Sequence, residues 1–366
     1  MQPQHFPYAR FKQFQAEKET ALLNFLSSRT PYDDVPVVVQ PPIDIWGNVS
    51  SDRVLSLERQ LEAFIVAMQL QSDFAFTYLE PWHGVGVFAN IFGCKVNWND
   101  FDAPQTLPIY QSIDEVAGLQ HPDILKAELP QMILETIRYY RSVTNDQLDI
   151  VLTDTQSPND SASLILDTSE FFACSLSDMP RLAPFMELLT QVMIEFSEMQ
   201  LAAMGPTAAH PGHIMLSSSR LPGISVSDDN MAVISRRAYE NAALPYNSHL
   251  GAHFGGIALH TCGDFSQNFA PLKQVSNLML VDCALDGVDP TPNNPRKLGE
   301  AFAGSGIPLK VRIGAGREYW QGLPELLRPD LKLILQIASD GDIEKSIELY
   351  QELKTTCRSI LKQKYH

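Results

Sequence analysis

The stretch GGIALHTCGDFSQNFAPLKQVSNLMLVDCALDG (255–287) contains the repeating unit from which the fold can be predicted. It has a short apolar run at 256–262, an amphipathic segment, and a second apolar run at 278–283. Short and nearly continuous apolar runs that alternate with helical segments are typical of parallel strands buried on both faces, each joined to the next by a helix. We therefore predict a strand–helix–strand unit here.

The same alternation extends over most of the chain. Eight apolar runs are predicted to be strands: 35–43 (VPVVVQPPI), 74–80 (FAFTYLE), 148–154 (LDIVLTD), 213–218 (HIMLSS), 256–262, 278–283, 308–314 (PLKVRIG) and 331–339 (LKLILQIAS). Helical segments are predicted between them, the longest at 51–71, 179–204 and 228–254, and another follows at 342–362.

Eight such units predict an α/β fold of the (β/α)8 TIM-barrel class. The barrel is expected to be one domain at 35–366, with an N-terminal helical extension at 1–34. An open doubly wound sheet is the alternative. The first strand, however, runs into PPIDIWGNVS (41–50) instead of the Gly-rich phosphate-binding turn typical of such sheets.

Composition narrows the class of protein. The 366 residues carry 43 acidic and 27 basic side chains, a formal charge of -16, which disfavours binding to nucleic acid or anionic membranes. Five scattered cysteines favour reduced thiols, and the N-terminus MQPQHFPYARFKQ lacks the apolar core of a signal peptide. No stretch approaches the ~20 apolar residues that span a bilayer. We expect a cytoplasmic protein that acts on a small molecule.

Chemically capable side chains follow the predicted strands, where TIM-barrel enzymes have their active sites. The candidates for catalysis are Glu80, His83, Asp229 and Arg312, and those for substrate binding are Trp46, Trp82, Ser218 and Gln336. Three of these have a structural alternative, which for Trp82 is a lid over the core. Ser227 or Asp228 can cap a helix that begins near Asp229, which leaves one aspartate free to face the barrel mouth. Arg312 suits an anionic substrate group, or it balances the acidic surface.

The sequence LHTCGD (259–264) is the sharpest local feature. Residues two apart in a strand point to the same side, so His260 and Cys262 are expected to project together. Imidazole nitrogen and thiolate sulfur suit zinc, which requires a third protein ligand at a catalytic site. Asp282 or Cys283, at the end of the next strand, is the expected third ligand, and Glu80 and His83 are weaker candidates. The alternative is that the pair is simply buried, since cysteine is often a core residue.

Three stretches, 72–96 (SDFAFTYLEPWHGVGVFANIFGCKV), 222–247 (PGISVSDDNMAVISRRAYENAALPYN) and 255–287, resemble the uroporphyrinogen decarboxylase superfamily. This superfamily also holds the zinc-dependent corrinoid and coenzyme M methyltransferases, and the resemblance implies a (β/α)8 barrel. The arginine-rich N-terminal segment and the Phe-Ser-Asp turn of true uroporphyrinogen decarboxylases are replaced here by PPIDIWGN and FTYLEPW. The chain therefore resembles the methyltransferase branch more closely.

That branch typically completes its His-x-Cys zinc site with a cysteine after the eighth strand, where this chain reads LILQIASDGD. Related cobalamin-independent methionine synthases add a carboxylate ligand at the end of the strand after His-x-Cys, which is the place of Asp282 and Cys283 here. The resemblance implies a methyltransferase in which a zinc-activated thiol accepts a methyl group from a corrinoid or another methylated donor. A corrinoid is expected on a separate partner protein, because no Asp-x-His-x-x-Gly motif is present.

The resemblance also implies a monomer or homodimer. Two alternatives remain for the function: a metal-free decarboxylase of a smaller carboxylated substrate, and a ligand-binding barrel without catalytic activity.

Overall fold

The structure is a computed structural model that describes residues 1–29, 32–46, 51–98 and 103–365. Its main sheet has six parallel strands in the order β1-β10-β9-β8-β7-β6. These strands are β1 (Val37–Gln40), β6 (Ile224–Ser227), β7 (Ile257–His260), β8 (Leu278–Ala284), β9 (Leu309–Arg312) and β10 (Leu333–Ala338). Parallel pairing between all neighbours follows from the helical crossover that joins each strand to the next.

A second, short parallel pair closes this sheet into a barrel. It consists of β2 (Tyr78–Leu79) and β5 (Asp149–Ile150). One isolated parallel bridge joins Val38 of β1 to Phe74, just before β2, and another joins Gln156, after β5, to Ser227 of β6. The ring therefore contains eight strands in chain order, which confirms the predicted (β/α)8 class. A small antiparallel hairpin of β3 (Val96–Asn97) and β4 (Gln105–Thr106) lies outside the ring.

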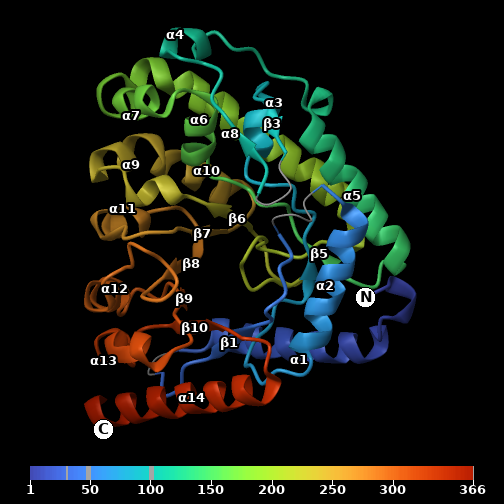
Figure 1. The fold of residues 1–366 in the computed structure, drawn as a ribbon. Helices are drawn as coiled ribbons and strands as arrows, with labels where there is room; N and C mark the ends of the chain where they lie inside the picture. The colour runs from blue at the N-terminus through green and yellow to red at the C-terminus, as the bar shows by residue number, and fades with distance from the viewer. Residues whose placement is uncertain (30–31, 47–50, 99–102, 366) are drawn as a thin grey trace.

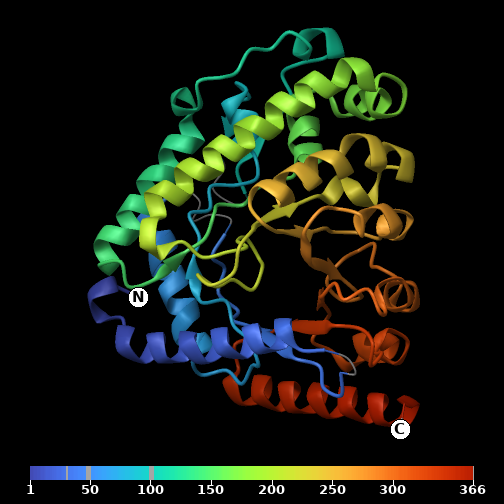
Figure 2. The ribbon, with the colours of Figure 1, turned by 180° about the vertical axis from the view of Figure 1, so that it is seen from behind.

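The prediction of a strand at 213–218 is wrong, because the fourth strand of the barrel is β6. Residues 208–218, which we call the inserted loop, enter the seam between β5 and β6: Ala208 bridges Ile150, and the Ser225 N–H donates to the Pro211 carbonyl at 2.9 Å. Met215 and Leu216 are buried in a small cluster with Leu22 of the N-terminal helix. The cluster also holds Val38, Ala258 and Ile334 of the barrel strands, so the apolar run reflects burial between those strands and the helix. Figure 2 shows the loop, in yellow-green, among the strands.

Helices surround the barrel (Figure 1). The longer ones are α1 (Tyr8–Ser27), α2 (Arg53–Ala67), α5 (Glu128–Thr144), α7 (Thr168–Ser177), α8 (Met179–Met204), α10 (Leu244–His253) and α14 (Ile343–Tyr365). The shorter ones are α3 (Val87–Ile91), α4 (Ile113–Val116), α6 (Pro158–Ile165), α9 (Arg236–Ala242), α11 (Phe269–Leu272), α12 (Pro295–Phe302) and α13 (Leu323–Leu326). None of the helices in the described part of the chain has the length and apolar content that a bilayer crossing requires.

Local chemistry explains several helix boundaries. The Asp52 carboxylate accepts the N–H groups of Val54 and Leu55 and so caps α2. The single helix predicted at 228–254 is divided into a 3-10 turn (Asp229–Ala232), α9 and α10. Pro245, in the first turn of α10, explains the second break, because a proline has no N–H to continue a helix from the preceding turn. The N-terminal helix is present as α1, as predicted.

Candidate metal centre and adjoining pocket

Three potential metal ligands meet at the carboxyl ends of β6 and β7. Asp229 lies in the turn after β6, His260 is the last residue of β7, and Cys262 follows two positions later. His260 Nε2 is 3.4 Å from Cys262 Sγ and 3.7 Å from Asp229 Oδ1, and the three donor atoms lie within 4.8 Å of one another. We call these residues the donor cluster. Its place at the strand ends is where a barrel presents reactive groups.

The chemistry of the donor cluster fits zinc. Imidazole nitrogen, thiolate sulfur and carboxylate oxygen are the usual zinc ligands, and three of them leave a fourth position for a substrate. Asp282 Oδ1 lies 2.7 Å from His260 Nδ1, so Nε2 is the nitrogen available for a metal. Burial and the Asp229 carboxylate raise the pKa of the Cys262 thiol to about 11, although Arg312 opposes this shift. The thiol therefore needs a bound cation to ionise at neutral pH.

Asp229 owes its position to a buried carboxylate on another element. Asp160 of α6 accepts the N–H groups of Asp229 and Asn230, at 2.6 and 2.9 Å. The prediction that Ser227 or Asp228 caps this turn is therefore wrong. Asp228 is fully buried and accepts hydrogen bonds from the side-chain amides of Asn159 and Asn247, at 2.7 and 2.8 Å. Fixed in this way, the turn directs the Asp229 side chain towards His260.

Asp282 links the donor cluster to the rest of the barrel interior. It is fully buried and forms ion pairs with Lys310 and with Arg312, whose Nε lies 3.0 Å from Oδ1. Burial alone would raise the pKa of Asp282, but Lys310 and Arg312 hold it well below its ordinary value. Lys310 Nζ also donates to Gln336 Oε1 at 2.6 Å, and Gln336 Nε2 donates to Gln40 Oε1 at 2.7 Å. Polar contacts thus run without interruption across β7, β8, β9, β10 and β1. We call the residues that make them the interior belt: His260, Asp282, Lys310, Gln336 and Gln40.

Neither residue predicted as the third ligand belongs to the donor cluster. The Asp282 carboxylate faces the barrel interior but is occupied by Lys310 and Arg312. Cys283 is the next residue in the strand, so its side chain points to the opposite face, where it is fully buried in the hydrophobic core. Burial raises its pKa far above that of an ordinary thiol. Asp229, predicted as a catalytic residue, occupies the place expected for the third ligand.

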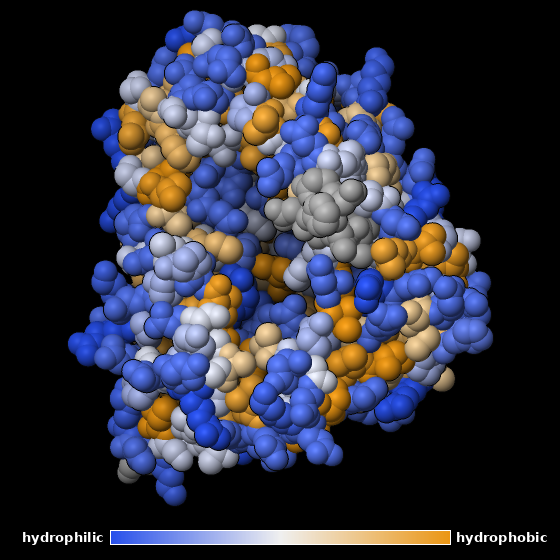
Figure 3. All heavy atoms as spheres, in the orientation of Figure 1, coloured by the Kyte–Doolittle hydropathy of each residue, from blue (hydrophilic) through white to orange (hydrophobic). Residues whose placement is uncertain are grey.

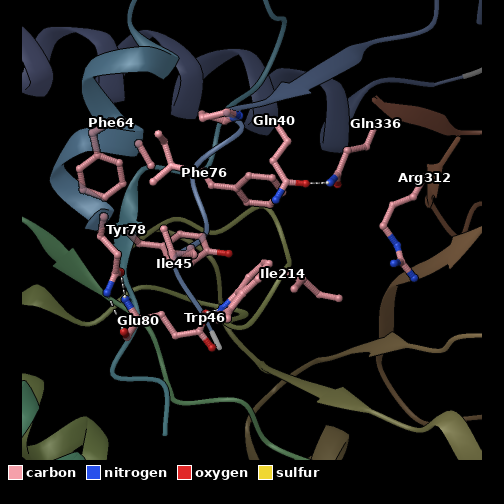
Figure 4. Close-up of a pocket in the computed structure, with 14 residues that line it drawn as sticks. Gln40, Ile45, Trp46, Phe64, Phe76, Tyr78, Glu80, Ile214, Arg312 and Gln336 are labelled. Carbon is pink, nitrogen blue, oxygen red and sulfur yellow. Dashed lines mark hydrogen bonds between the residues drawn. The ribbon is translucent and has the colours of Figure 1, made fainter. Parts of the chain in front are cut away.

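A largely apolar pocket of about 150 Å³ adjoins this region (Figure 4). It is lined by Gln40, Pro41, Ile43, Ile45, Trp46, Gln60, Ala63, Phe64, Phe76, Tyr78, Glu80, Ile214, Arg312 and Gln336. The pocket thus includes Trp46, Glu80, Gln336 and Arg312 from the predicted site. Arg312 connects the two places, because its Nη2 is 3.9 Å from Cys262 Sγ. The face of the molecule in Figure 3 is hollowed near its centre.

A histidine that the sequence did not single out, with 13% of its side-chain surface exposed, lies beside Glu80. His213, in the inserted loop, has Nδ1 at 2.6 Å from Glu80 Oε1 and Nε2 at 3.5 Å from Asp154 Oδ2. Burial by itself lowers the pKa of His213, but the carboxylates of Asp154 and Glu80 outweigh it and raise the pKa to about 9. His213 is therefore a cation at neutral pH. The local sequence HPGHIM gives no signal for this role, since both carboxylates come from distant strands.

The remaining predicted residues, Trp82, His83 and Ser218, belong neither to the donor cluster nor to the residues that line the pocket. Trp82 is buried, and its indole N–H donates to Asp154 Oδ2 at 3.3 Å. His83 is buried with Nε2 3.0 Å from Thr136 Oγ1 of α5, and so points towards that helix. Ser218 does not end a strand: its hydroxyl contacts Glu19 of α1, where the inserted loop meets the N-terminal helix.

Residues 66–210 match the uroporphyrinogen decarboxylase family model. The predicted resemblance is confirmed over this stretch, which ends before the donor cluster. No curated protein matches the whole chain or any part of it. A methyltransferase from Methanosarcina mazei has a similar structure, with a TM-score of 0.64 and 15% sequence identity over 94% of this chain and 98% of that one. At this identity the similarity supports the barrel fold.

Proposed function

We propose that the protein is a zinc-dependent methyltransferase in which a thiol accepts a methyl group from a corrinoid or another methylated donor. The observation that carries the proposal is the donor cluster, in which nitrogen, sulfur and oxygen ligands converge at the strand ends with Asp282 supporting the imidazole. The barrel shared with a methyltransferase and the match to the uroporphyrinogen decarboxylase family are consistent with it.

In this proposal Asp229, His260 and Cys262 would hold the zinc ion, beside which the substrate thiol would bind. Bound zinc lowers the pKa of a thiol so that the nucleophilic thiolate is present at neutral pH. Asp282 keeps the His260 ring in the orientation that presents Nε2. In the transfer, the acceptor sulfur forms a bond to the methyl carbon while the bond from that carbon to the donor breaks, and the donor keeps the electron pair.

Arg312 is the residue we assign to the charged end of the substrate. Its guanidinium lines the pocket and lies beside Cys262, so an anionic group held there would keep the rest of a small molecule near the donor cluster. The corrinoid, where it is the donor, is proposed to arrive on a separate protein. Trp46 and Gln336 would contact the substrate within the pocket.

Metal analysis of the purified protein is the first test. About one equivalent of zinc per chain is expected, either as isolated or after incubation with zinc and removal of the excess. Cys262→Ala should lose the metal, whereas Cys283→Ala, its matched control on the next strand, should retain it, because Cys283 is buried in the hydrophobic core. Cobalt substitution adds a direct readout, since a thiolate ligand gives a charge-transfer absorption that only Cys262→Ala should abolish.

Methyl transfer is tested next with methylcobalamin as donor and a panel of small thiols, some with an anionic tail and some without. Less than about 0.2 equivalents of zinc with no uptake, or equal metal content in the two cysteine variants, would refute the proposed metal site. Release of carbon dioxide from small carboxylated compounds by a metal-free protein would favour the decarboxylase alternative.

A further inference from the structure

The walls of the pocket define the body of a ligand. Most are apolar or aromatic, with Trp46, Phe64, Phe76 and Ile214 among them. An apolar cavity of about this size, ~150 Å³, is known to take a benzene ring. In Figure 4 Trp46 lies between Glu80 on one side and Arg312 on the other. The shape suits a ring-sized apolar group with one polar substituent.

The charges around the pocket define that substituent. Among the described lining residues, Glu80 and Arg312 are the two with charged side chains. Both oxygens of Glu80 are engaged, Oε1 by His213 and Oε2 by the indole N–H of Trp46 at 3.2 Å. The Arg312 charge is less completely balanced, because its partner Asp282 is shared with Lys310. A ligand in the pocket therefore faces the Glu80 carboxylate, whose charge is neutralised, and the Arg312 guanidinium, whose positive charge is only partly balanced.

The inserted loop keeps His213 in place. Tyr78 donates its hydroxyl hydrogen to the carbonyl oxygens of Gly212 and Met215, which flank the histidine closely. The next residue, Ile214, has φ of 47° and its side chain lines the pocket. A β-branched residue rarely adopts this left-handed conformation, so the surrounding contacts impose it. His213 and Ile214 are thus presented to the pocket region by a constrained backbone.

We propose that this pocket binds a monoanion with an apolar body about the size of a benzene ring, such as an aromatic carboxylate, and that His213 determines the preference for negative charge. Arg312 pairs with the anionic group, and the aromatic walls enclose the ring. His213 acts through Glu80: by neutralising that carboxylate it removes the repulsion that an anion would meet. That the pocket holds part of the substrate rests on the proposed function. Its preference for anionic ligands does not.

Binding of three probes of similar size and different charge tests the proposal: benzoate, benzyl alcohol and benzylamine. Titrations of the intact protein are followed by calorimetry and by intrinsic tryptophan fluorescence, to which Trp46 in the pocket wall contributes. Benzoate is expected to bind about tenfold more tightly than benzyl alcohol, as a charge-assisted hydrogen bond would give, and benzylamine least well. Arg312→Gln should remove the preference for benzoate while leaving the binding of benzyl alcohol intact.

Two further variants separate a charge effect from simple damage. His213→Gln leaves Glu80 uncompensated, so benzoate should bind more weakly and benzylamine more strongly. Glu80→Gln removes the negative charge itself, so benzoate should bind as well as before or better. His210→Gln is the matched control in the same loop, because the His210 ring contacts the Gly223 carbonyl and does not reach Glu80.

Equal affinity for benzoate and benzyl alcohol in the unchanged protein would overturn the proposal. A loss of benzoate binding in both the His213 and the Glu80 variants would also overturn it. The two substitutions change the local charge in opposite directions, so an equal loss would indicate a structural defect. If the His213 variant fails to fold, the Arg312 and Glu80 variants still decide the outcome. None of these measurements requires methyl transfer or zinc, so a failure of the proposed function leaves the binding result interpretable, and the reverse also holds.

Discussion

Replacing Asp282 by asparagine is expected to be among the most destabilising single changes in the barrel interior. The carboxylate is fully buried and pairs with Lys310, which is also fully buried, and with Arg312. Asparagine keeps the shape and removes the charge, which leaves Lys310 as a buried cation without its partner. Removing one member of a buried ion pair typically costs ~3–5 kcal/mol, a large part of a total stability of ~5–15 kcal/mol.

The pH dependence of this loss has a definite sign. Burial lowers the pKa of Lys310 even with Asp282 beside it, and the substitution should lower it further. In Asp282→Asn the folded state therefore binds fewer protons at this lysine than the unfolded state does. The stability of the variant should rise relative to the unchanged protein as the pH increases from 7 towards 10, where the unfolded lysine also begins to lose its proton.

Equilibrium unfolding in urea, followed by far-UV circular dichroism at pH 7 and pH 10, measures both effects. Asp340→Asn is the control, because it removes the partner of an exposed lysine, Lys345, and should leave the midpoint nearly unchanged. The double variant Asp282→Asn with Lys310→Met should recover part of the loss. A loss below about 1 kcal/mol for the single variant, or a double variant less stable than the single one, would refute the buried-charge explanation.

Two further changes follow from the same structure. His213, whose pKa is raised from 6.5 to about 9 between Glu80 and Asp154 and near Asp282, should stabilise the folded state fully below pH 6.5 and lose this contribution as the pH rises through 9. At pH 6 the free energy of unfolding in urea should be about 3 kcal/mol larger for the unchanged protein than for His213→Gln, and the two should become similar at pH 10. A difference that does not depend on pH would exclude a cationic His213. Gly251→Ala should lower the thermal midpoint, because the added Cβ would lie 2.2 Å from the Ser276 carbonyl oxygen, and such overpacking costs ~1–3 kcal/mol. Gly118→Ala, with nothing within 4 Å of the added atom, should change it little, and equal midpoints for the two variants would contradict this reading of the packing.

The barrel could be predicted because most of its strands are apolar runs that pair as they are ordered in the chain. The run at 213–218 was misleading, since a local pattern cannot distinguish burial in a sheet from burial against a helix. Met215 and Leu216 are as buried as strand residues, but they pack in a cluster that joins Leu22 of α1 to side chains of the barrel strands. The short strand that replaced it, Ile224–Ser227, reads ISVS and has too few apolar residues to stand out.

Two of the three residues of the donor cluster could be predicted from local sequence, and the third could not. The spacing of His260 and Cys262 places both side chains on one side of the chain, and strand periodicity is enough to see this. The third position depends on contacts between distant segments. Nothing in the sequence around Asp282 reveals that Lys310, on the following strand, neutralises it. In the same way, Asp229 reaches His260 because Asp160 holds its turn, and His213 becomes a cation because β2 and β5 each bring a carboxylate.

The interior belt has a consequence for how this protein can change over generations. Gln40 and Gln336 are hydrogen-bonded although 296 positions separate them, and the chain of contacts continues through Lys310 and Asp282 to His260. Loss of Gln40 leaves the Gln336 amide without its acceptor, and loss of Asp282 leaves Lys310 without its counter-charge, so a change at one position favours a compensating change at its partner. We therefore expect β1 and β10, which are remote in the gene, to change together.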